Sequence, residues 1–188
     1  MRVLVAGVGN VLRADDAFGV EVARRMQDMD LPRGVKVVET GIGGMALVQE
    51  LQRGWDALIV ADCVDLGRPP GQVMMILPDV IDVQVLSLEE RMDLLADMHL
   101  ATPERVFMLS KALGVLPAKL MMVGCQPVDP DTPGIPMSEP VRKAVDVAVE
   151  EILRHIGELR AEERAARAVS RAATDPAAPA APAAEETP

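Results

Sequence analysis

Short apolar runs alternate with segments of helical period along most of the chain, and this alternation constrains the fold more than any other feature. The runs typical of buried strands are residues 2–6, 35–39, 57–61, 72–77 and 119–124. Helical spacing of apolar residues occurs from residue 16 onward and in 47–51, 103–113 and 138–159. Strands separated by helices favour an α/β domain whose mainly parallel sheet is covered on both faces.

Local signals set several expected boundaries. The first helix is expected to bury Phe18, Val22, Met26 and Met29, and one of its entry carboxylates is expected to cap it. A capping box at 87–90 predicts a short helix through about residue 96. Residues 102 and 103, a Thr-Pro pair, are typical of a helix N-cap and first turn. The last helix is expected to turn these residues inward: Val141, Val145, Val149, Ile152, Ile156 and Leu159.

The composition changes toward the C-terminus and sets the expected domain limits. Residues 1–160 form the expected α/β domain, and 161–174, rich in Ala, Glu and Arg, form a helical extension. Residues 175–188 include four prolines and six alanines, so this tail is expected to be disordered.

The charge balance and the two cysteines exclude several classes of protein. With 19 Lys+Arg against 29 Asp+Glu, the net charge of −10 argues against nucleic-acid binding. Two cysteines make neither a disulfide framework nor a zinc knuckle. No apolar run reaches the roughly 20 residues that span a membrane, and the N-terminus lacks a signal-peptide pattern. We expect a cytoplasmic monomer.

Candidate site residues follow from the rule that parallel sheets bind ligands at the carboxyl ends of their strands. Asp16 lies at the helix entry after the first strand, and Asp62 ends the strand at 57–61. Two carboxylates brought together without a partner raise each other's pKa or recruit a cation. His99 lies in a loop without an evident structural role, whereas His155 is expected to be a solvated helix residue. Two carboxylates and an imidazole suit zinc or nickel, with a coordination position left open.

Two other chemistries are less well supported by the residues. The Gly7-Val8-Gly9 turn resembles the start of a dinucleotide fingerprint, but Leu12 replaces the third glycine and the helix entry is acidic. A Cys63–His99 dyad is the rival catalytic hypothesis. Adjacent strand residues point to opposite faces, so only one of Asp62 and Cys63 readily faces a cleft.

The combined motifs resemble one known family. Residues 7–19, from Gly7 to Gly19, match the GxGNxLxxD(D/E)xxG signature of the nickel–iron hydrogenase maturation endopeptidases. The resemblance covers about residues 1–156 and continues through these further matches: Gly44-Met45, Leu58–Asp62, Pro70-Gly71, His99, Leu120–Pro127 and Ser138. One departure is Glu39-Thr40, where relatives commonly have Asp-Gly.

The resemblance implies a three-layer α/β/α sandwich with a five-stranded, mainly parallel twisted sheet between helices. It also implies an endopeptidase that removes the C-terminal extension of a hydrogenase large-subunit precursor after nickel insertion. Asp16, Asp62 and His99 match the family's metal-holding residues, with nickel supplied by the substrate and zinc or cadmium able to replace it. The alternatives are a nickel- or precursor-binding chaperone that does not cut, and a Cys63-dependent hydrolase.

Overall fold

The computed structural model describes residues 1–90, 92 and 102–174. Its strands are β1 (Val3–Val8), β2 (Val35–Gly41), β3 (Ala57–Cys63), β4 (Val73–Ile76) and β5 (Lys119–Cys125). Its α-helices are α1 (Phe18–Gln27), α2 (Gly44–Leu51), α4 (Pro103–Ala112) and α5 (Glu139–Thr174). Two 3-10 turns, η1 (Ala14–Ala17) and η2 (Val83–Val85), complete the named elements.

The five strands form one mixed sheet in the order β2-β1-β3-β5-β4. β1, β2, β3 and β5 are parallel, whereas β4 runs antiparallel to β5 at one edge. β2 pairs with one side of β1, and β3, which follows later in the chain, pairs with the other side. β1 and β3 therefore flank the topological switch point of the sheet, where ligands bind in open α/β proteins. The predicted α/β fold is confirmed.

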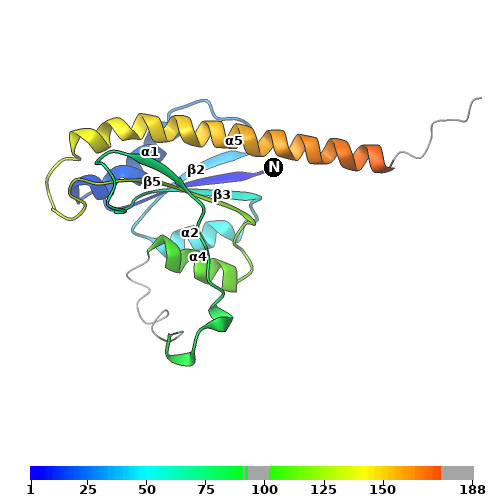
Figure 1. The fold of residues 1–188 in the computed structure, drawn as a ribbon, viewed down its shortest axis with the longest axis horizontal. Helices are drawn as coiled ribbons and strands as arrows, with labels where there is room; N and C mark the ends of the chain where they lie inside the picture. The colour runs from blue at the N-terminus through cyan, green and yellow to red at the C-terminus, as the bar shows by residue number, and fades with distance from the viewer. Residues whose placement is uncertain (91, 93–101, 175–188) are drawn as a thin grey trace, which may run out of the picture.

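Helices cover both faces of this sheet, as Figure 1 shows. α1 and α5 pack on one face, and their core includes Phe18, Met26 and Ile152. α2 and α4 pack on the other face, with Leu47 and Phe107 among the buried residues. β1 and β3 are covered on both sides, which explains why their sequences are almost continuously apolar.

The long helix α5 carries its predicted core stripe. The following residues are all buried: Val141, Val145, Val149, Ile152, Ile156 and Leu159. The helix continues without a break to Thr174, and the tail at 175–188 lies outside the described residues. None of the helices in the described ranges is both long and apolar enough to cross a membrane.

Four local expectations have different outcomes. The capping box at 87–90 is confirmed, because the Ser87 amide donates to Glu90 Oε2 (2.7 Å) and the Glu90 amide donates to Ser87 Oγ (3.2 Å). Most of the helix predicted through residue 96 lies outside the described residues. Thr102 is the N-cap residue of α4 and Pro103 its first residue, as predicted, although the Thr102 side chain makes no capping hydrogen bond. The burial predicted for Met29 is wrong, because α1 ends at Gln27 and Met29 is exposed.

Candidate active site

Close packing of α1 against the sheet brings Asp16 toward Asp62. Gly7 of β1 pairs with Ala61 of β3, immediately before Asp62. A Cβ placed on Gly19 of α1 would lie 2.1 Å from the Ala61 carbonyl oxygen and 2.3 Å from that of Val8. Only a glycine allows the start of α1 to come so near both strands. Asp16 lies three residues before Gly19, so the same packing holds it beside the end of β3.

Asp16 is half-buried on the turn η1. Its Oδ2 accepts a hydrogen bond from the Asn10 backbone amide at 2.9 Å. Burial raises the pKa of this carboxyl, and the Asn10 hydrogen bond and the positive charge of Arg13 oppose that rise. The carboxylate is thus held by the loop that precedes it.

Asp62 is the more strongly perturbed carboxyl. Its side chain is 7% exposed, and Oδ1 accepts a hydrogen bond from the Cys63 amide at 2.8 Å. Burial raises its pKa to about 7, and the negative charges of Asp16 and Glu104 add to the rise. In the described part of the chain, no ion pair includes Asp62. A buried carboxyl that titrates near neutrality and lacks a cationic partner is typical of functional sites.

The third predicted ligand, His99, lies outside the described residues. Within residues 1–90, 92 and 102–174, no group of three His, Cys, Asp or Glu residues is arranged to hold a metal ion. The structure therefore brings together the two predicted carboxylates and leaves the imidazole untested. His155 is not the solvated residue expected, because its side chain is only 17% exposed and its Nδ1 lies 3.5 Å from Glu158 Oε2.

Asp15 has a role that the sequence did not predict, since one entry carboxylate was expected to cap the first helix. Neither entry carboxylate caps α1, whose N-cap position is occupied by Ala17 without a side-chain bond. Asp15 is fully buried and accepts hydrogen bonds from the amides of Val128 (2.8 Å), Asp129 (3.0 Å) and Ser138 (2.6 Å). The Ser138 hydroxyl donates a fourth at 3.0 Å. Asp15 thereby fastens the segment carrying Asp16 to the β5–α5 loop (residues 126–138).

The remaining candidates have structural partners. Glu39 Oε2 accepts from Arg24 Nε at 3.1 Å, and Thr40 Oγ1 donates to the Gly7 carbonyl oxygen at 3.1 Å. Cys125 is buried in the α1–α5 core, and burial raises its thiol pKa to about 12. Burial also raises the pKa of the Cys63 thiol, and the nearby charge of Asp62 adds to that shift. A thiol in such surroundings stays protonated at neutral pH, which weighs against a cysteine nucleophile.

These features define the class of protein: a doubly covered α/β enzyme with paired carboxyls at the switch point of its sheet. Comparison with known proteins identifies the family. The family model described as hydrogenase maturation protease matches residues 20–155. The chain is 34% identical over 156 residues to the hydrogenase expression/formation protein HupD from Rhodobacter capsulatus, covering 82% of this chain and 71% of that protein.

Solved structures agree with this family. The hydrogenase maturating endopeptidase HybD from E. coli is 28% identical, with a TM-score of 0.65 over 84% of this chain and 93% of that one. A hydrogenase 2 maturation peptidase from a Thaumarchaeota archaeon is 34% identical, with a TM-score of 0.60 over 84% and 99% of the two chains. The chain belongs to the hydrogenase maturation protease family. It is an endopeptidase that processes the C-terminus of a hydrogenase large subunit.

Proposed function

We propose that Asp16, Asp62 and His99 together engage nickel that is already bound by the large-subunit precursor. The observation that carries this proposal is Asp62, a buried carboxyl without a cationic partner in the described residues, beside a second carboxyl at the switch point. Such an arrangement costs stability in the free protein and is relieved when a divalent cation arrives. The imidazole of His99 is the proposed third ligand.

The proposed chemistry is hydrolysis of the peptide bond that joins the C-terminal extension to the mature subunit. Hydrolysis requires a polarised carbonyl and an activated water, and a divalent metal ion supplies both. A carboxylate beside the metal is suited to accept the proton of the attacking water. Both Asp16 and Asp62 lie at the edge where this water would stand.

Metal recognition would also make the enzyme selective for the nickel-loaded precursor. Because the nickel arrives with the substrate, only a nickel-loaded large subunit completes the ligand set. Because the metal is supplied by the substrate, the free protein does not need to bind nickel tightly.

One experiment separates this proposal from its alternatives. Nickel-loaded precursor is incubated with wild-type protein and with the variants D16A, D62N, H99A and C63A, and the mass of the large subunit is followed. We expect loss of the extension with wild type and C63A, and uncut precursor with the other three variants. A binding chaperone would retain the precursor without shortening it. A cysteine hydrolase would fail with C63A and retain activity with D62N.

A further inference from the structure

Several exposed aliphatic side chains gather beside the candidate active site. Leu12 is 72% exposed and Ile42 is 67% exposed, and Val11 and Ile135 are exposed as well. They come from the β1–η1, β2–α2 and β5–α5 loops, which all leave the same edge of the sheet. We call Val11, Leu12, Ile42 and Ile135 the apolar rim. Clustered exposed apolar residues of this kind mark interaction sites.

Backbone hydrogen bonds join the three loops of the apolar rim. The Gly9 amide donates to the Gly41 carbonyl at 3.2 Å, which ties the first loop to the second. The Gly134 amide donates to the Leu12 carbonyl at 3.0 Å, and Arg13 forms an isolated bridge with Pro133. The rim is therefore held in one arrangement before any partner binds, which lowers the entropic cost of association.

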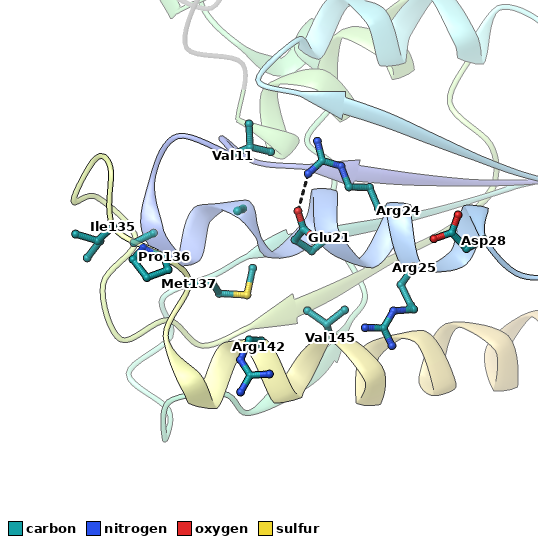
Figure 2. A pocket seen from close by; sticks show the side chains of 12 residues that line it. Val11, Glu21, Arg24, Arg25, Asp28, Ile135, Pro136, Met137, Arg142 and Val145 are labelled. Atoms are coloured by element: carbon teal, nitrogen blue, oxygen red, sulfur yellow. Dashed lines mark hydrogen bonds and ion pairs between the residues drawn. The ribbon is translucent and has the colours of Figure 1, made fainter.

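The hollow beside Val11, Leu12 and Ile42 contains a single cation, which is ion-paired. Val11, Leu12 and Ile42 line a hollow of about 260 Å³ whose charged residues are Arg24 and Glu39. Arg24 pairs with Glu39 at 3.1 Å and with Glu21 at 2.6 Å, so the described residues place no unpaired cation at this hollow. Figure 2 shows Val11 and Ile135 among the residues of a second hollow of about 400 Å³, which runs along α1 beside α5. The second hollow is also lined by charged residues, of which Arg25 pairs with Asp146 and Arg142 with Glu139. The first hollow suits an apolar side chain better than a charged one.

The position of the rim identifies its occupant. Val11 and Leu12 directly follow Asn10, whose amide holds the Asp16 carboxylate. A precursor that presents its cleavage site to Asp16 therefore comes close to the rim. The geometry points to the apolar rim as the docking surface for the large-subunit precursor, which inserts apolar side chains next to its cleavage site. This inference rests on the proposed function, because it takes Asp16 to be part of the active site.

The test compares L12D and I42D with the control L77D. Leu77 is 76% exposed and follows β4 at the opposite edge of the sheet, because β4 runs antiparallel to β5. Cleavage of nickel-loaded precursor is measured over a range of precursor concentrations. We expect L12D and I42D each to raise KM about tenfold or more, as hot-spot residues do, with kcat changed less than about twofold. L77D should leave both parameters at wild-type values.

Two results would overturn this inference. One is an unchanged KM for both L12D and I42D. The other is a wild-type dimer that L12D converts to a monomer without a change in KM, which would assign the rim to a second copy of the chain. If wild-type protein leaves the precursor uncut, the proposed function fails. The rim is then tested directly by sedimentation, where wild type and L77D should bind the precursor with equal affinity and L12D should bind it about tenfold more weakly.

Discussion

At the scale of single residues, Asp62 links stability to the candidate chemistry. Its pKa rises from an ordinary value of 3.8 to about 7 because the fold removes it from water. Between these two values the native state holds a proton that the unfolded chain has lost, so stability falls as pH rises through this window. The penalty is complete above about pH 7. A neutral residue at position 62 would not cause this loss of stability.

We therefore expect D62N to gain stability relative to wild type as pH rises from about 5 to about 8, by roughly 2–3 kcal/mol. Asparagine retains an oxygen that can accept the Cys63 amide. The measurement is urea unfolding of both proteins across this pH range, with D30N at an exposed aspartate as the control. Parallel pH profiles for wild type and D62N would contradict the prediction.

Unlike Asp62, Asp15 is expected to stabilise the folded protein. It accepts four hydrogen bonds while fully buried, three of them from backbone amides. In D15N, one of the two side-chain oxygens becomes an amide donor that faces other donors. We expect D15N to lose roughly 2–4 kcal/mol of unfolding free energy, because bonds to a charged acceptor are lost and buried donors stay unsatisfied.

Asp16 provides the matched control for Asp15. Its carboxylate accepts one backbone amide and is only half-buried, so D16N should lose less than about 1.5 kcal/mol. Denaturant unfolding of both variants checks the contrast. Equal losses for D15N and D16N would show that the hydrogen-bonded carboxylate at position 15 does not carry the stability of the two loops.

Asp15, Asp16 and Asp62 show which features of the site can be predicted from the sequence. Asp16 and Asp62 were predicted because each follows a recognisable strand, and parallel strands end at one edge. The role of Asp15 was not predictable, because its partners lie 113 to 123 residues further along the chain. An aspartate at a helix entry has the same local pattern whether it caps the helix or fastens a distant loop.

At the scale of elements, strand positions were predictable and strand direction was only partly so. The apolar runs located all five strands, and helices between successive strands indicated parallel pairing. The run at 72–77 has no feature that distinguishes an antiparallel edge strand from a parallel one. Its direction depends on the missing helix between β3 and β4 and on pairing with β5, which follows later in the chain.

The contact between α1 and the sheet can be tested at Gly19. A Cβ there would lie within 2.3 Å of two carbonyl oxygens, and both belong to central strands that cannot move easily. We expect G19A to lose roughly 2–4 kcal/mol of unfolding free energy, because α1 must shift away from β1 and β3. The control is G157A in α5, where an added Cβ meets no atom within 4 Å. A G19A protein as stable as G157A would contradict this account of the packing.

At the scale of the whole molecule, recognition by long-range charge and recognition by the apolar rim predict different responses to salt. The chain has a net charge of −10, so a partner attracted by long-range charge would bind more weakly as salt rises. The apolar rim predicts a different response to salt. Burial of apolar surface is not screened by salt, and a metal–carboxylate contact acts at bonding distance.

We therefore expect kcat/KM for nickel-loaded precursor to change less than about threefold between about 0.05 and about 0.5 M sodium chloride. The measurement is cleavage at low precursor concentration across this range, with unfolding midpoints recorded at each salt concentration to exclude effects on stability. L12D should lower kcat/KM by a similar factor at every salt concentration, because the lost contact is apolar. A steep fall of kcat/KM with salt in wild type would instead mean that the acidic surface, not the rim, dominates recognition of the precursor.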